Sequence, residues 1–280
     1  MKHIWYNPLA SKGKSKKKAF KLYKKLKKTS EIKLHKIKNY DDFDNIVNET
    51  EEADDVILVG GDGALHYFVN ALQNVDFKFK VYLCKAGSGN DFAREYKGKL
   101  IDITNEIKNL PYINYEKVKN GNIIKTKEYF INGMGSGIDA QVCYDQNNSR
   151  VKKSYFKIAV NAFKTFKSYD LNLTVDGKEY KYSNVWFCAI QNGKYFGGGM
   201  KIAPSAKRDD EYLDCYIITS PKRKKVVFLF PLIFFGKHIW AKSCVKYIKG
   251  KNFIMDIKDY NLLQLDGETR IYQNKIEISR

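Results

Sequence analysis

The first hundred residues alternate between short apolar runs and longer amphipathic stretches. The apolar runs predict strands, at residues 3–6, 31–37, 56–59 and 78–84. The stretches between them predict helices, at residues 14–28, 40–48 and 64–73. This alternation is typical of a parallel sheet with helices on both faces.

The pattern changes near residue 110, after which short strands follow one another directly. They are predicted at residues 112–119, 123–131, 171–175, 180–190, 213–219, 243–247, 253–257 and 262–265. Asn120-Gly121 and Asp176-Gly177 are typical hairpin turns. One helix is predicted at residues 149–169, where apolar residues recur every three or four positions. We therefore expect two domains, α/β over residues 1–110 and antiparallel β with one or two inserted helices over residues 111–280.

The strand at residues 56–59 runs directly into a glycine cluster with one carboxylate, Gly60-Gly61-Asp62-Gly63. Glycine allows a positive φ and lets backbone N–H groups approach an anion, and the helix that follows adds its positive N-terminal end. A phosphate group would therefore bind here. Because Asp62 is negative, its use would be to hold a metal ion, or water on that ion, which bridges the phosphate oxygens. The alternative is a plain strand-to-helix turn with Asp62 as N-cap.

A second glycine-rich turn follows the strand at residues 78–84. It reads Gly87-Ser88-Gly89-Asn90-Asp91 and leads into a helix start. Open α/β sheets bind ligands outside the carboxyl ends of their strands, so two such turns on neighbouring strands predict a ligand crevice.

Together the two turns resemble the diacylglycerol kinase catalytic-domain family, which includes bacterial lipid kinases and the sphingosine and ceramide kinases. The family pattern is GGDGT followed by P-x-G-T-x-N-D-F-A-R. This chain has Ala64 in place of the first Thr, and Ser88 keeps the hydroxyl that touches the nucleotide in the family. The resemblance implies a Rossmann-like three-layer α/β domain, NAD kinase/diacylglycerol kinase-like, followed by an antiparallel β-sandwich domain.

The resemblance also implies an ATP site in the first domain. Its residues would be Asn7, Ser11, Gly13, Gly60, Gly61, Asp62, Gly63, Gly87, Ser88, Asn90 and Asp91. The first loop matches the family's N-P-x-(A/S)-G loosely. Gly13-Lys14-Ser15 looks like the end of a Walker A loop, but Pro8 stands where that motif needs its first glycine, which excludes a P-loop.

In the second half, Leu263-Gln264-Leu265-Asp266-Gly267-Glu268 resembles the family's L-D-G-E segment. By that resemblance Glu268 is the general base on the lipid hydroxyl, and Asp266 joins the Mg²⁺–water network of Asp62 and Asp91. An ordinary hairpin corner is the alternative reading. The glycine-rich stretch at residues 132–140, predicted as a turn after a strand, resembles the family's G-x-G-x-D-A segment.

The segment around Asp210 resembles the family's GGG-M…D-G-x-L-D block, in which an aspartate helps to bind a structural Mg²⁺. Asp210 and the backbone carbonyls of Lys207 and Tyr212 would form that site, since hard oxygen ligands suit Mg²⁺. Glu211 replaces the family's glycine here, and a charged surface turn is the alternative.

Composition agrees with an anionic partner. The chain has 280 residues, with 50 Lys and Arg against 31 Asp and Glu and a net charge of +19. Its scattered cysteines, with no CxxC pair, suggest free thiols in a reducing cytosol. The N-terminus lacks the apolar segment of a signal peptide, and the longest apolar run, residues 226–235, is too short to span a bilayer.

The sequence therefore predicts a cytoplasmic lipid kinase, peripheral at the inner membrane face, that uses ATP and Mg²⁺ and meets its lipid substrate at an anionic membrane surface. The lipid would enter a cleft between the domains. Basic and apolar residues from 221 to 251 fit a helix lying on the membrane, although a core helix is an equal alternative.

Two other functions compete with this prediction. A soluble NAD-kinase-like phosphotransferase would share only the Gly60–Gly63 turn. A basic protein that binds nucleic acid would need a recognition motif that the sequence lacks. The sequence does not fix the lipid or the oligomeric state, and a homodimer is compatible with it.

Overall fold

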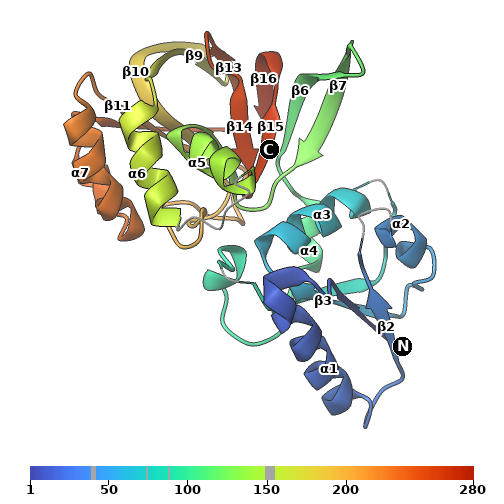
Figure 1. The fold of residues 1–280 in the computed structure, drawn as a ribbon. Helices are drawn as coiled ribbons and strands as arrows, with labels where there is room; N and C mark the ends of the chain where they lie inside the picture. Colours follow the sequence, from blue (N-terminus) through green and yellow to red (C-terminus); the bar gives the residue numbers. More distant parts are fainter. Residues whose placement is uncertain (39–41, 74, 88, 149–154) are drawn as a thin grey trace. The chain divides into compact units, whose positions relative to one another are not determined.

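The computed structural model describes residues 1–38, 42–73, 75–87, 89–148 and 155–280 (Figure 1). The chain forms two compact units, Met1–Leu110 and Pro111–Arg280. Each unit has its own sheet.

The sheet of the first unit has five strands in the order β2-β1-β3-β4-β5. The strands are β1 (Lys2–Tyr6), β2 (Ile32–Lys36), β3 (Asp55–Gly60), β4 (Lys80–Lys85) and β5 (Ile101–Asp102). β1 to β4 run parallel, and β5 pairs with β4 antiparallel. The parallel strands therefore end at one edge of the sheet, where the two glycine turns follow β3 and β4.

Helices cover both faces of this sheet. They are α1 (Lys14–Leu26), α2 (Asp42–Val47), α3 (Asp62–Leu72) and α4 (Thr104–Lys108). Side chains alternate along β1, so Ile4 and Tyr6 share a core with Ala19 of α1. Trp5 points to the other face, where its ring packs 5.3 Å from that of Phe68 in α3. The result is the predicted three-layer α/β arrangement (Figure 1).

The sheet of the second unit has eleven strands. They are β6 (Tyr112–Lys119), β7 (Asn122–Tyr129), β8 (Gly133–Gly137), β9 (Tyr169–Val175), β10 (Lys178–Gln191), β11 (Leu213–Thr219), β12 (Val245–Gly250), β13 (Asn252–Ile257), β14 (Leu262–Leu265), β15 (Glu268–Ile271) and β16 (Gln273–Ser279). Nine follow the order β15-β14-β8-β10-β9-β13-β16-β6-β7, while β11 joins β10 to β12. The pairs are antiparallel.

The long strand β10 changes partners along its length. Lys178–Tyr182 pair with β9, whereas Phe187–Gln191 pair with both β8 and β11, with register shifts near Val185. β-Bulges of this kind bend a strand. The bend allows one continuous set of strands to wrap around a single core.

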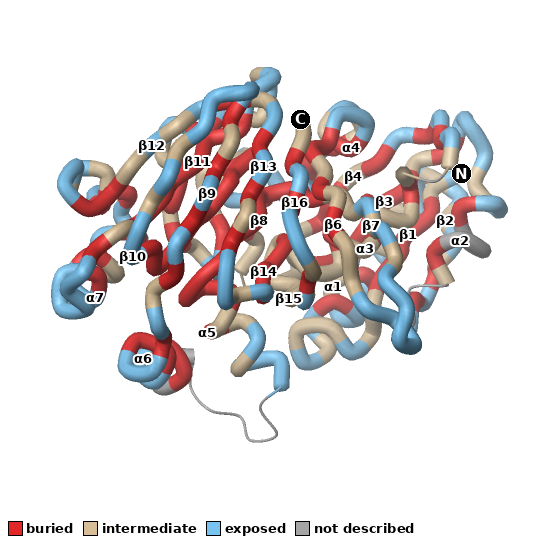
Figure 2. The backbone as a smooth tube through the Cα atoms, turned by 90° about the horizontal axis from the view of Figure 1, so that it is seen from above, coloured by how far each residue is buried: buried red, intermediate tan, exposed pale blue. Residues whose placement is uncertain are grey.

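Three helices pack on this unit: α5 (Ile138–Asn147), α6 (Tyr155–Thr165) and α7 (Arg223–Phe234). In Figure 2 their outer sides are exposed, while the strands beneath them are largely buried. No helix within the described residues is long and apolar enough to cross a membrane.

The predicted fold class is confirmed, but the stretch at residues 132–140 was predicted wrongly. The glycine-rich stretch 132–140 is not a turn: it contains strand β8 and the start of α5. A Cβ on Gly133 would lie 2.3 Å from the Gln191 side chain, and one on Gly135 would lie 1.9 Å from Asp139 Oδ2. These glycines are needed for close packing of a buried strand, not for a change of chain direction. The helix predicted at 149–169 is α6 over Tyr155–Thr165, but its predicted end is wrong, because residues 166–168 are not helical and Tyr169 begins β9. Residues 149–154 lie outside the described chain.

Candidate active site

The two glycine turns of the first unit touch each other through their backbones. A Cβ on Gly61 would lie 2.6 Å from Gly87 Cα, and one on Gly87 would lie 2.5 Å from Gly61 Cα. Ala86 N–H donates to the Gly60 carbonyl oxygen at 2.7 Å and so ties the two strand ends together. The approach leaves no room for a side chain at Gly61 or Gly87.

Asn90 shapes the second turn. Its Oδ1 accepts a hydrogen bond from Gly87 N–H at 2.9 Å, and its Nδ2 donates to Gly87 O at 2.6 Å. Asn90 has a φ of 52°, a left-handed conformation that asparagine tolerates better than most residues. Ser88, a predicted nucleotide contact, lies outside the described residues.

The two carboxylates of these turns are close in the structure. Asp62 lies in the first turn of α3, and its Oδ1 accepts a hydrogen bond from Phe92 N–H at 3.2 Å, directly after Asp91. The Asp91 side chain is buried, with its Oδ1 3.4 Å from Arg94 Nε. The pair supplies the hard oxygen donors that Mg²⁺ prefers, so these residues fit a nucleotide-bound Mg²⁺.

The loop after β1 lies at the same edge of the sheet. Asn7 Oδ1 accepts a hydrogen bond from Leu9 N–H at 2.9 Å, and Ser11 and Gly13 have φ values of 51° and 82°. Ser15 in α1 donates to the Val59 carbonyl oxygen at 2.6 Å, which holds the loop beside the end of β3. Neither α1 nor α3 has a side-chain hydrogen bond at its N-cap. Lys14 N–H, at the start of α1, already donates to the Ser11 carbonyl oxygen. Because both N-caps are glycines, no capping side chain covers the positive N-terminal ends of these helices, which attract anions.

In the second unit, the corner between β14 and β15 is a two-residue turn of Asp266 and Gly267, with φ values of 49° and 94°. The Asp266 carboxylate accepts hydrogen bonds from the backbone N–H groups of Ile131, Asn132 and Gly133, at 2.8, 2.7 and 3.2 Å. Asp266 therefore fastens the corner to the segment that enters β8. Glu268 follows at the start of β15, partly exposed.

Gln264 joins this corner to a buried carboxyl group on α5. Its Oε1 accepts a hydrogen bond from Gly267 N–H at 2.8 Å, and its Nε2 donates to Asp139 Oδ2 at 3.3 Å. Burial raises the pKa of Asp139 to about 7. Burial also raises the pKa of the Cys143 thiol to about 12, and the nearby charges of Asp139 and Glu268 add to that shift. Asp139 and Glu268 therefore both lie near Cys143.

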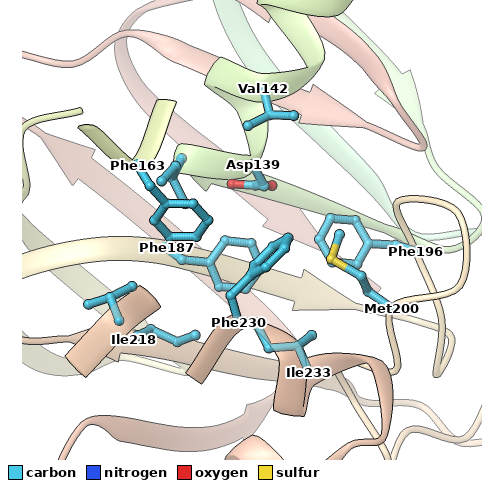
Figure 3. Close-up of a pocket in the computed structure, with 11 residues that line it drawn as sticks. Asp139, Val142, Phe163, Phe187, Phe196, Met200, Ile218, Phe230 and Ile233 are labelled. Carbon is cyan, nitrogen blue, oxygen red and sulfur yellow. The ribbon is translucent and has the colours of Figure 1, made fainter. Parts of the chain in front are cut away.

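Asp139 faces a small pocket with apolar walls and a cavity volume of about 30 Å³. Its walls come from α5, α6, α7, β10, β11 and the segment around Phe196. Figure 3 shows Phe163, Phe187 and Phe230 around the space, with the Asp139 carboxyl at one side. The Asp139 Oδ1 atom is buried, with no hydrogen-bond partner among the residues that the structure describes. Apolar walls with a single polar group are the kind of lining expected where an apolar chain binds.

Neither Gln264 nor this pocket was predicted from the sequence. The pocket residues come from separate elements and share no period. The position of Asp139 could have pointed to the pocket, because this carboxylate directly follows a stretch rich in glycine and apolar residues, where a charged side chain is unexpected.

The proposed structural metal site fits poorly. Asp210 Oδ2 lies 2.8 Å from Lys249 Nζ, and its Oδ1 accepts a hydrogen bond from Tyr212 N–H at 3.1 Å. Glu211 forms an ion pair with Lys251. In the described part of the chain, no group of three or more His, Cys, Asp or Glu side chains is placed to hold a metal. The predicted ligands are the Asp210 carboxylate and the backbone carbonyls of Lys207 and Tyr212. They are a weak donor set for Mg²⁺, because the one carboxylate already neutralises the Lys249 ammonium group.

Comparison with known proteins decides the family. Residues 3–123 match the diacylglycerol kinase catalytic domain, and residues 132–273 match the YegS C-terminal NAD kinase beta sandwich-like domain. The chain is 30% identical over 228 residues to the putative lipid kinase YtlR of Bacillus subtilis, across 76% of this chain and 73% of that protein. The chain belongs to the diacylglycerol kinase catalytic-domain family.

Two further relatives have lower sequence identity. A diacylglycerol kinase of Mycobacterium tuberculosis is 26% identical over 199 residues, 66% of this chain and 62% of that protein. The crystal structure of a diacylglycerol kinase from Bacillus anthracis superposes with a TM-score of 0.69 at 19% identity, covering 100% of this chain and 94% of the other. That likeness shows the shared fold. The predicted resemblance to the diacylglycerol kinase family is confirmed.

Proposed function

We propose that this protein is an ATP-dependent lipid kinase that transfers the γ-phosphate of ATP to the hydroxyl of a lipid such as diacylglycerol. The observation that favours a lipid as the phosphate acceptor is the apolar pocket on the second unit. Gln264 links Asp139 in this pocket to the β14–β15 corner, where Glu268 lies. A soluble acceptor such as NAD would not need a pocket walled by Phe163, Phe187 and Phe230. Relatives named as lipid and diacylglycerol kinases support the same choice.

ATP would bind at the carboxyl ends of β1, β3 and β4. The positive N-terminal ends of α1 and α3 would face its phosphates, beside the two turns that meet at the Gly61–Gly87 contact. Asp62 and Asp91 would hold Mg²⁺, which when bound neutralises charge on the phosphate oxygens.

Glu268 would act as general base. As the lipid hydroxyl oxygen forms its bond to the γ-phosphorus and the bond to ADP breaks, the hydroxyl proton passes to the Glu268 carboxylate. In this proposal Asp266 positions Glu268, because both of its oxygens accept backbone hydrogen bonds that fix the corner. Transfer needs the residues of both units.

The substrate would be met at an anionic membrane surface, with the protein peripheral and otherwise cytoplasmic. The net charge of +19 supports an anionic partner. Nucleic acid is not expected as a partner, because the sequence contains no recognition motif for it.

The test is transfer of radiolabelled phosphate from ATP to diacylglycerol, phosphatidylglycerol, sphingosine or undecaprenol in mixed micelles, with NAD as a soluble acceptor. We expect one of the lipids to be labelled. Glu268→Gln should lower the rate at least about 100-fold, as expected for loss of a general base, and Asp62→Asn should have a similar effect. Glu277→Gln, a change at an exposed glutamate on β16, is the control and should act as wild type.

Two results would count against the proposal. Full transfer by Glu268→Gln would remove Glu268 as the base. Labelling of NAD without labelling of any lipid would replace the lipid acceptor by a soluble one.

A further inference from the structure

Helix α7 has apolar side chains on two opposite sides. On its inner side Val226, Phe230 and Ile233 line the pocket, and the Phe230 ring packs 5.0 Å from that of Phe163 (Figure 3). On its outer side Phe228 is 78% exposed, and Phe235, directly after the helix, is 72% exposed. A soluble helix normally has polar residues on its outer side, so this apolar side needs an explanation.

Cationic side chains flank the outer apolar side at both ends. Lys224 and Lys225 lie in the first turn of α7, and Lys237 follows its end. These three lysines are exposed and have no carboxylate partner among the described residues. The chain contains no acidic residue between Asp214 and Asp256. The surface is therefore apolar in the middle and positively charged around it.

Trp240 extends this surface beyond the helix. Its side chain is 71% exposed, and Lys237 Nζ lies 5.5 Å from its ring centroid. Tryptophan beside lysine is the pairing found where proteins meet the headgroup level of a bilayer.

Arg223, unlike the neighbouring lysines, contacts other parts of the second unit. Its guanidinium donates to the carbonyl oxygens of Lys164 and Phe166 and lies 5.5 Å from the Trp186 ring. These contacts anchor the start of α7 to the rest of the unit. The outer side of α7 is thus presented by a fixed helix, not by a loose segment.

We propose that α7 docks the protein on an anionic lipid bilayer through a docking surface of Lys224, Lys225, Phe228, Phe235, Lys237 and Trp240. The aromatic side chains enter the interface and the lysines meet lipid phosphates. This inference builds on the proposed lipid kinase function, because the same helix would then separate the bilayer from the pocket that takes the lipid. The charge of this surface favours an anionic bilayer over a second copy of this chain. Two copies, each with a net charge of +19, would place lysines against lysines.

The experiment measures sedimentation of the 280-residue chain with lipid vesicles in the absence of ATP. One set of vesicles is phosphatidylcholine alone, and the other contains about one phosphatidylglycerol in three lipids, which gives a surface potential in the physiological range. We expect binding to the anionic vesicles, weak binding to the neutral ones, and a loss of binding as salt rises. Phe228→Ser with Phe235→Ser should weaken binding at least about tenfold. The control is Val118→Ser with Ile123→Ser, which removes two exposed apolar side chains from the β6–β7 hairpin and should leave binding unchanged.

Three results would overturn the docking proposal. They are equal binding to both kinds of vesicle, equal binding by the two double variants, or a wild-type dimer in sedimentation velocity that Phe228→Ser with Phe235→Ser converts to monomer. A micellar kinase assay separates this proposal from the proposed function. Phosphate transfer to a lipid without vesicle binding would contradict the docking proposal and leave the kinase proposal standing. Vesicle binding through α7 without phosphate transfer to any lipid would contradict the kinase proposal and leave the docking proposal standing.

Discussion

Asp139 is a carboxyl group in surroundings that do not favour its charge. Its neighbours in the pocket are largely apolar, and Gln264 donates to one of its oxygens at 3.3 Å. Gly135 allows this placement, since a Cβ there would lie 1.9 Å from Asp139 Oδ2. Burial is the main reason why the pKa of Asp139 rises from 3.8 to about 7.

This pKa predicts how stability changes with pH. Between pH 4 and pH 7 the folded protein keeps a proton on Asp139 that the unfolded chain has released. The stabilising contribution of this group is therefore full below about pH 4 and is lost as the pH rises to about 7. Asp139→Asn cannot ionise and should escape this loss. We expect its free energy of unfolding, relative to wild type, to increase by about 2–3 kcal/mol between pH 5 and pH 8.

Urea denaturation of both proteins at pH 5 and pH 8 measures that difference. Asp209→Asn, at an exposed carboxylate, is the matched control and should follow wild type at both pH values. If Asp139→Asn also ran parallel to wild type, Asp139 would be ionised in the folded state at pH 5, and the apolar description of the pocket would be wrong.

At the scale of elements, the β14–β15 corner is held by one side chain. Three backbone N–H groups donate to Asp266, so a change there should loosen the corner as a whole. Asp266→Asn keeps a residue that tolerates the positive φ of 49° but loses the negative acceptor. We expect a loss of about 2–3 kcal/mol in the free energy of unfolding, together with slower transfer because Glu268 is no longer fixed.

Asp259→Asn is the control for this change. Asp259 also has a positive φ, 62°, but it is exposed. Its substitution should change stability by less than about 0.5 kcal/mol. Equal denaturation midpoints for the two variants would show that the hydrogen bonds of Asp266 do not hold the corner.

The sequence predicts elements well where a local rule applies and poorly where packing decides. β3 and its glycine turn follow from a β-branched run that ends in glycines, and the β6–β7 hairpin follows from Asn120-Gly121. β8 escaped prediction because its glycines resemble a turn. These glycines are needed because the side chains of Gln191 and Asp139 and the backbone of Trp186 pack against them, and only the fold reveals these contacts.

The candidate site divides in the same way. The Gly61–Gly87 contact follows from two glycine turns on neighbouring parallel strands, so the sequence could predict it. The link from Asp139 through Gln264 to Gly267 joins residues more than 120 positions apart, and the sequence contains no periodic signal for it.

At the scale of the whole molecule, each of the two units has its own sheet and its own hydrophobic core. No strand of one sheet pairs with the other sheet in the described chain, and each unit has its own buried core. The proposed roles divide along the same line, with the nucleotide residues in Met1–Leu110 and the pocket and docking surface in Pro111–Arg280. The two binding functions should therefore be separable from each other and from catalysis.

The separation can be tested with two fragments, residues 1–110 and 111–280. We expect the first to bind ADP within about threefold of the full chain, because its site needs only its own turns and helix starts. Gly87→Ala in that fragment should abolish binding, since the new Cβ would lie 2.5 Å from Gly61 Cα.

The second fragment should sediment with anionic vesicles and should not bind ADP. Neither fragment alone should transfer phosphate, because Asp62 and Glu268 would be on different chains. ADP binding by the second fragment, or a first fragment that folds but does not bind ADP, would contradict this assignment of roles.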